Sequence, residues 1–218
     1  MDSATWELIR HNLQPMLEAT VTKTLPLTAI SFVIGLALAL ARMSKVWPVS
    51  AAARCYISII RGTPLLVQLF IVFYALPQLN IVIDPFPAAV IAFSLNVGGY
   101  AAEVIRAAIL SVAAGQWEAS QALGLSYPQT LSSIILPQAA RIAVPPLSNT
   151  LISLVKDTSL ASTILVTELL RTAQLAAAPT FDFFALYGVA AVYYWIICLL
   201  LGFAQTRLEE RLARHVAR

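Results

Sequence analysis

Charged side chains are scarce in this sequence. Only 11% of the 218 residues are charged, whereas an ordinary soluble domain carries about 25%. A soluble protein of this size needs far more polar surface to stay dissolved. Hydrophobic residues make up 59% of the chain and gather in long uninterrupted runs, which a soluble core does not need. The sequence therefore predicts an all-α membrane protein.

Three other features are missing as well. No glycine-rich loop of the form G-x-x-x-x-G-K-[ST] occurs, so the chain is not expected to hydrolyse ATP alone. Cys55 falls in an expected loop and Cys198 in an apolar run, where neither a disulfide nor a metal site is expected. The polar stretch 2–24 lacks the pattern of a cleavable signal peptide, so the first apolar segment is expected to stay in the membrane.

Five segments are apolar enough to cross a membrane, which takes about 20 residues of helix. They lie between Lys23 and Arg42, over about 62–83, over about 87–110, from Arg141 through Lys156 and Asp157, and between Asp182 and Arg207. We expect one membrane domain over 1–218, with its core at about 17–208.

The basic residues indicate the orientation of these spans. The net charge is +3, and the basic residues sit at the ends of apolar runs, so membrane topology explains them better than nucleic-acid binding. Lysine and arginine gather over 42–54 and after residue 207, and Arg106 and Arg141 bracket the loop between the third and fourth spans, which predicts that these regions are cytoplasmic. The N-terminus is then outside and the C-terminus inside, although Arg10 and Arg171 do not fit this pattern. The tail over 205–218 is expected to continue the fifth span as a solvated helix.

The segment 115–137 is expected to form two short helices between the third and fourth spans. One runs over about 116–123 and stops at Gly124, a residue suited to a left-handed cap position. The second starts at Ser126 and ends at Pro137. A connection of this length is rarely only a link, because most connections between helices are short.

This segment resembles the signature of permease subunits of ATP-binding-cassette (ABC) importers, which reads Glu-Ala-Ala, three residues, Gly, nine residues, Ile, one residue, Leu-Pro. The matching residues are Glu118, Ala119, Gly124, Ile134, Leu136 and Pro137, and Ser120 replaces the third small residue. The resemblance implies a type I ABC importer permease fold. It also implies that the loop over about 111–137 is a cytoplasmic coupling helix, which docks onto an ATPase through these residues and Leu125. The alternative is a helical hairpin without a partner.

The resemblance covers nearly the whole chain and includes the polar amino-acid permeases. Arg61-Gly-Thr-Pro64 and Lys156-Asp157-Thr-Ser159-Leu resemble the histidine, arginine, glutamine and cystine importers, and 145–160 looks closest to the cystine permeases. The resemblance implies a bacterial inner-membrane protein that is not itself an enzyme. Its implied partners are an ATPase subunit that holds the ATP and Mg, a solute-binding protein outside the membrane, and a second permease chain. The sequence leaves open whether that chain is identical or a sister.

Polar residues inside the expected spans are candidate functional groups, because polar groups are costly there. Asn96 and Tyr100, one helical turn apart and next to Gly99, are expected to line a cavity for an amino acid. The other expected members of this substrate pathway are Gln68, Lys156, Asp157 and Ser159. Charged partners of both signs suit a zwitterion. Two alternatives stay open, namely helix packing through the glycines and an internal pair between Lys156 and Asp157.

Glu103 and Arg106 are three residues apart on one face of the third span, so they are expected to pair and to brace that span. Two other kinds of protein remain alternatives to an ABC importer. One is a secondary transporter driven by an ion gradient, although no internal repeat is evident. The other is a membrane scaffold that transports nothing.

Overall fold

The computed structural model describes residues 27–213, and within this range every regular element is helical. The helices are Leu27–Arg42, α2 (Trp47–Gly62), α3 (Leu65–Phe70), α4 (Pro85–Ser111), α5 (Ala114–Ala122), α6 (Tyr127–Thr130), α7 (Leu136–Asp157), α8 (Leu169–Thr180) and α9 (Phe183–Ala213). Shorter helical turns extend them at Ile71–Ala75, Leu76–Leu79, Leu131–Ile135 and Thr158–Ile164. The polar stretch 2–24, the expected start of the first span and the last residues of the tail lie outside the described range.

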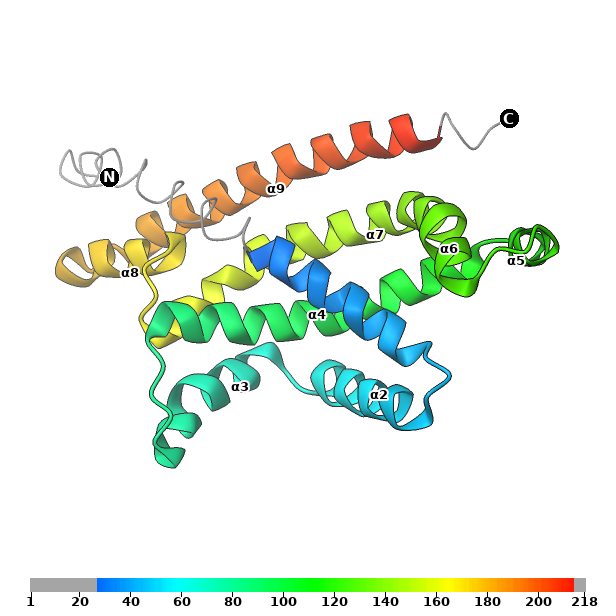
Figure 1. Cartoon of the computed structure of the whole chain (residues 1–218). Coiled ribbons are helices and arrows are strands. Elements are labelled where there is room, and N and C mark those ends of the chain that lie inside the picture. The colour runs from blue at the N-terminus through cyan, green and yellow to red at the C-terminus, as the bar shows by residue number, and fades with distance from the viewer. Residues whose placement is uncertain (1–26, 214–218) are drawn as a thin grey trace.

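Helix α4 forms the centre of the bundle. Figure 1 shows α4 between α2 and α3 on one side and α7 and α9 on the other, with the Leu27–Arg42 helix crossing it. In the most apolar stretch of α4, 61% of the residues are buried, whereas in that of α9 only 11% are. The exposed residues of α9 include Phe184, Trp195 and Leu200. Helix α4 is therefore the core element, and α9 presents an apolar surface suited to lipid.

The helices agree with the expected all-α membrane fold. Helices α4 and α9 are each long and apolar enough to cross a membrane. Two bent pairs raise the number of candidate spans to four: α2 with Leu65–Leu79, bent by 105°, and Tyr127–Ile164 with α8, bent by 47°. The Leu27–Arg42 helix is apolar but shorter within the described residues. Together these five segments correspond to the five expected spans.

The predicted beginning of the second span, at about residue 62, is wrong. Gly62 ends α2 instead of starting a span, and Cys55 lies on α2 where a loop was expected. Thr63 has φ −121° and ψ 144°, the extended conformation that a residue before proline prefers. The helix therefore breaks at Thr63 and Pro64, and the chain continues in α3 at a sharp angle.

The fourth expected span also begins earlier than expected. Pro137 does not end the preceding helix but lies in the first turn of α7, which starts at Leu136. Proline is tolerated there, because the first N–H groups of a helix have no partner inside it. A π-type turn, Leu131–Ile135, joins α6 to α7, so the helical path continues through this region.

Helix α8 was not expected from the sequence, and Glu168 explains how it begins. The buried Glu168 carboxylate accepts hydrogen bonds from the backbone N–H groups of Leu170 and Arg171, as an N-cap residue does. It also accepts a hydrogen bond from the hydroxyl of Tyr194 on α9, at 2.6 Å. One carboxylate thus starts α8 and joins it to α9.

Glycines bring α4 close to its neighbours. A Cβ atom on Gly98 would lie 2.6 Å from Cγ2 of Ile34, and a Cβ on Gly99 would lie 2.7 Å from Cγ2 of Ile60. Neither position accepts a larger side chain unless the facing isoleucine, or the helix that carries it, moves. The two glycines therefore set the distance between α4 and these helices.

Replacing Gly99 by alanine is expected to destabilise the protein by about 1–3 kcal/mol, because the added Cβ overlaps Ile60. The measurement is the thermal unfolding midpoint in detergent. Gly188→Ala is the matched control, since no neighbouring atom lies within 4 Å of a Cβ there. Adding Ile60→Ala removes the overlapping methyl group. The stability lost by the double variant should therefore be smaller than the sum of the losses measured for the two single variants. A Gly99→Ala variant that unfolds like the wild type contradicts this packing.

Candidate functional site

A cluster of charges around Glu103 joins three helices. Arg106 donates a hydrogen bond to Oε2 of Glu103 at 3.2 Å, so the expected pair is present. Arg42, from the Leu27–Arg42 helix, donates to Oε1 of the same carboxylate. Arg61, at the end of α2, places Nη1 3.9 Å from Oε2. Sequence reasoning missed Arg42 and Arg61, because nothing in the chain order relates them to Glu103.

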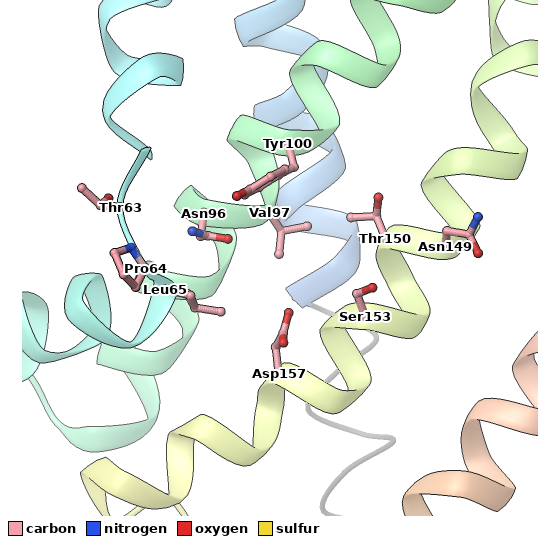
Figure 2. Close-up of a pocket in the computed structure, with 10 residues that line it drawn as sticks. All are labelled: Thr63, Pro64, Leu65, Asn96, Val97, Tyr100, Asn149, Thr150, Ser153 and Asp157. Atoms are coloured by element: carbon pink, nitrogen blue, oxygen red, sulfur yellow. The ribbon is translucent and has the colours of Figure 1, made fainter. Parts of the chain in front are cut away.

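A cavity of about 390 Å³ lies beside this cluster, between the break after α2, helix α4 and helix α7. Figure 2 shows its lining residues, which are Thr63, Pro64, Leu65, Asn96, Val97, Tyr100, Asn149, Thr150, Ser153 and Asp157. Seven of these side chains carry a polar group. The cavity is therefore polar, although the helices around it are largely apolar.

The break between α2 and α3 is held by the side chain of Gln68. Its Nε2 donates to the carbonyl oxygen of Ile60 at 2.9 Å and to Oγ1 of Thr63 at 2.8 Å. Its Oε1 accepts a hydrogen bond from Nδ2 of Asn96 at 3.0 Å. Gln68 therefore satisfies a carbonyl in the last turn of α2, which has no partner within that helix, and fixes the orientation of the Asn96 amide.

Asp157 contributes a carboxylate to the cavity from the end of α7. Figure 2 shows its side chain pointing into the space between α4 and the Thr63–Pro64 break. Among residues 27–213 no side chain or backbone group donates a hydrogen bond to this half-buried carboxylate, and no salt bridge joins it to Lys156. A carboxylate of this kind can accept hydrogen bonds from a cation that enters the cavity.

The expected pathway residues fall into two groups. Asn96, Tyr100 and Asp157 line the cavity, and Gln68 stands directly behind Asn96. Gly99 faces Ile60 of α2, Lys156 is exposed outside the cavity, and the Ser159 hydroxyl donates to the Lys156 carbonyl oxygen at 2.7 Å.

Sequence reasoning missed several lining residues, which are Thr63, Pro64, Leu65, Val97, Asn149, Thr150 and Ser153. For α7 a signal was available, because Thr150, Ser153 and Asp157 follow the three- and four-residue spacing of one helix face. For Thr63 no such signal existed, since its exposure to the cavity depends on the angle of the helix break.

The expected docking loop forms two helices joined by a tight turn. Helix α5 ends before Gly124, whose φ of +73° lies in the left-handed region that favours glycine. Ser126 then caps α6, and the Gln129 side chain accepts from the Ser126 backbone N–H at 2.9 Å. The rings of Trp117 and Tyr127 stack across the turn at 5.8 Å. These contacts make the loop a compact unit.

The eight expected docking residues differ in exposure. Glu118, Ala119, Gly124 and Pro137 are exposed, whereas Ser120, Leu125, Ile134 and Leu136 are buried or half-buried. The hydroxyl of Ser120 donates to the carbonyl oxygen of Gln116 at 2.6 Å, so serine is accommodated at this small-residue position. The exposed group forms a surface, and the other group supports it.

Figure 1 shows where this loop lies in the bundle. Helix α5 is at one end, together with the turn after the Leu27–Arg42 helix and the C-terminal end of α9, whereas α8 is at the opposite end. The segments expected to be rich in basic residues and the expected docking loop are therefore at the same end of the molecule.

Comparison with known proteins agrees with these features. Residues 5–214 match the family described as "Binding-protein-dependent transport system inner membrane component". The L-cystine transport system permease protein TcyB of Bacillus subtilis (strain 168) is 55% identical over 98% of this chain and 93% of its own length. The glutamine transport system permease protein GlnP of Escherichia coli (strain K12) is 40% identical over 96% of each chain.

Solved structures show the same fold. A chain from the crystal structure of an amino acid ABC transporter with histidines has a TM-score of 0.90 and 33% identity, covering 97% of this chain and 99% of that one. A chain of the MetNI methionine ABC transporter has a TM-score of 0.78 at 20% identity, with the same coverage, which shows likeness of fold alone. From its sequence match and its helical architecture together, this chain belongs to the family of binding-protein-dependent transport system inner membrane components, the permease subunits of ABC importers.

Proposed function

We propose that this chain moves an amino acid, with cystine as the first candidate, across the bacterial inner membrane by ATP-driven alternating access. The observation that carries the proposal is the polar cavity of about 390 Å³ beside the helix break, with the Asp157 carboxylate turned into it. No group among residues 27–213 donates a hydrogen bond to this carboxylate, and an ionisable side chain among membrane-spanning helices is a candidate functional group. An ammonium group that enters the cavity can donate hydrogen bonds to it.

The other cavity side chains suit the uncharged parts of an amino acid. Asn96 and Thr63 offer amide and hydroxyl groups, and Tyr100 offers an aromatic face and a hydroxyl. Asn96 is held in place by Gln68, so its position does not depend on the ligand. A fixed polar group of this kind contributes affinity without an ordering cost.

The names of two relatives support the choice of cargo. TcyB, 55% identical, is named as an L-cystine permease, and GlnP, 40% identical, as a glutamine permease. The segment 145–160, which resembles the cystine permeases, contains Asn149, Thr150, Ser153 and Asp157 of the cavity wall. Cystine is therefore the first candidate and other polar amino acids follow it.

The loop that contains α5 and α6 is the proposed docking site for the ATPase, which carries the ATP and Mg. The exposed Glu118, Ala119, Gly124 and Pro137 form the contact surface, and Trp117 stacked on Tyr127 stiffens it. A stiff loop can pass movement of an ATPase to α4 and α7, which directly precede and follow it. In this proposal a second permease chain completes the pathway, and a solute-binding protein delivers the amino acid from outside.

The proposed orientation places the end of the bundle with α5 in the cytoplasm. The turn after the Leu27–Arg42 helix carries Lys45, and the end of α9 carries Arg207 and Arg211, all at the end of the bundle where α5 lies. Because α9 ends there, the C-terminus is inside in this proposal. The N-terminus, which lies outside the described residues, is then on the other side of the membrane after five spans.

Uptake by the reconstituted transporter tests the function. We expect proteoliposomes that contain this chain, its ATPase and its binding protein to accumulate radiolabelled cystine only when ATP is supplied. A protonophore should leave the uptake intact. Uptake that survives without ATP but collapses with the ion gradient would identify a secondary transporter. The last alternative is a membrane scaffold. In that case the intact chain would neither transport cystine nor co-purify with the ATPase, and replacing residues 115–137 would change neither result.

Asp157→Asn is expected to lower uptake about tenfold or more, because an amide cannot pair with an ammonium group as a carboxylate does. The matched control is Lys156→Gln, which changes the charge of the adjacent residue outside the cavity and should retain uptake. Both variants are compared at equal amounts in the membrane. Equal uptake by Asp157→Asn and the wild type would remove Asp157 from the pathway.

Gly124→Asp is expected to uncouple transport, because it places a charged side chain at the exposed turn and strains a backbone with φ +73°. Gly115→Asp adds the same charge to the same loop at a glycine without positive φ and without neighbours within 4 Å of a Cβ, so it should have a much smaller effect. The measurement is ATP-dependent uptake together with co-purification of the ATPase. Full uptake by Gly124→Asp would argue against docking at this turn.

A further inference from the structure

The cluster around Glu103 contains more positive charge than its carboxylate can neutralise. Three arginines, Arg42, Arg61 and Arg106, lie within 4.0 Å of one glutamate, and among residues 27–213 no other carboxylate forms a salt bridge with them, which leaves an excess of two positive charges there. The Glu103 side chain is only 17% exposed, and Glu103 and Arg106 lie on α4, which is long and apolar enough to cross a membrane. Uncompensated charge is costly in such a place, so a second anion would stabilise the cluster.

Arg61 is the arginine that Glu103 holds least firmly. Arg42 donates a hydrogen bond to Oε1 and Arg106 donates one to Oε2, so both carboxylate oxygens already have a donor. Arg61 is 3.9 Å from Oε2, which is too far for a hydrogen bond, and its side chain is 44% exposed. Bracing of α4 against the Leu27–Arg42 helix does not need this third cation.

Arg61 also lies beside the cavity, in contact with one of its lining residues. Its guanidinium lies over the ring of Tyr100, with 5.5 Å between the guanidinium carbon and the ring centroid, and Tyr100 lines the cavity. Thr63 and Pro64, which follow Arg61 at the helix break, line the cavity as well. The contact with an aromatic ring holds the guanidinium near the cavity, and because its N–H groups donate no hydrogen bond to any group among residues 27–213, they can bind an anion.

Negative and positive side chains therefore lie at different sides of the cavity. Asp157 faces the space from α7, as Figure 2 shows, and Arg61 contacts Tyr100, which lines the cavity from α4. Glu103 is three residues further along α4 than Tyr100, toward Ser111 and the loop with α5. A zwitterion whose ammonium group is near Asp157 thus meets positive charge on the α2 and α4 side of the cavity.

We propose that Arg61 binds the α-carboxylate of the amino acid and selects for cargo in which that group is free. This proposal rests on the proposed transport function and adds a specificity-determining residue to it. The carboxylate takes two parallel hydrogen bonds from the guanidinium and compensates the excess positive charge of the cluster. When the cargo leaves, Arg61 returns to its weak contact with Glu103, so release does not leave a cation without an anion nearby.

Binding to the purified permease–ATPase complex without the binding protein tests this proposal. The probes are radiolabelled cystine as ligand and unlabelled cystine or cystine dimethyl ester, which lacks free carboxylates, as competitor. We expect the wild type to bind the ester about tenfold or more weakly than cystine. In Arg61→Gln, binding of cystine should fall to the level of the ester, whose binding stays unchanged. Arg61→Lys should keep part of the difference, because lysine supplies charge without the bidentate geometry.

The matched control is Arg54→Gln, an exposed arginine on the same helix that forms no salt bridge within residues 27–213. The Arg54→Gln variant should bind cystine more tightly than the ester by the same factor as the wild type does. If Arg61→Gln keeps the wild-type discrimination, or weakens both probes equally, Arg61 does not recognise the carboxylate and the proposal is overturned. If Arg61→Gln does not assemble with the ATPase, Arg61→Lys is measured instead. An Arg61→Lys variant that prefers cystine over the ester as strongly as the wild type does would overturn the proposed bidentate contact. Failure of the proposed function would appear separately, as absence of ATP-dependent uptake by the wild type.

Discussion

The carboxylate of Glu103 is the point at which three helices are tied together by charge inside an apolar bundle. It accepts hydrogen bonds from Arg42 of the Leu27–Arg42 helix and from Arg106 of α4, whereas Arg61 of α2 makes a weaker contact at 3.9 Å. Charges in a membrane-spanning region are stable only when they find partners, so separating the Leu27–Arg42 helix from α4 carries a large cost. Gly98 and Gly99 allow the close approach that these contacts need. The position of α2, and with it one wall of the cavity, depends on the packing of Ile60 against Gly99 and on the weaker contact of Arg61 with Glu103.

The polar cavity is a consequence of the broken helix. A break inside a membrane protein leaves backbone groups without partners, and such groups must be satisfied by side chains or by water in a cavity. Gln68 satisfies the carbonyl of Ile60 and contacts Thr63, while its own oxygen orients Asn96. The same residues that repair the break therefore supply polar groups to the cavity. The hydrogen bonds of Gln68 thus both stabilise the helix break and orient a side chain of the candidate binding cavity.

Sequence reasoning was accurate where the signal is local and less accurate where it depends on packing. The apolar runs predicted α4 and α9, and Gly124 predicted the left-handed turn after α5. Helix α2 was missed because its exposed polar residues resemble a loop, and α8 because it is short and begins at a buried glutamate. Asn96, Tyr100 and Asp157 were selected as polar residues in apolar runs and do line one cavity. The contribution of Thr63, like the approach of Arg61, depends on the angle between α2 and α3.

The account depends most on the claim that this cavity holds the amino acid during transport. A structure of the complete transporter determined with cystine present tests that claim directly. We expect the ligand between Asp157 of α7 and Tyr100 of α4, with its ammonium group on the Asp157 side and a carboxylate toward Arg61. Cystine bound elsewhere along the pathway, with the cavity between α2, α4 and α7 closed by its own side chains, would contradict the account.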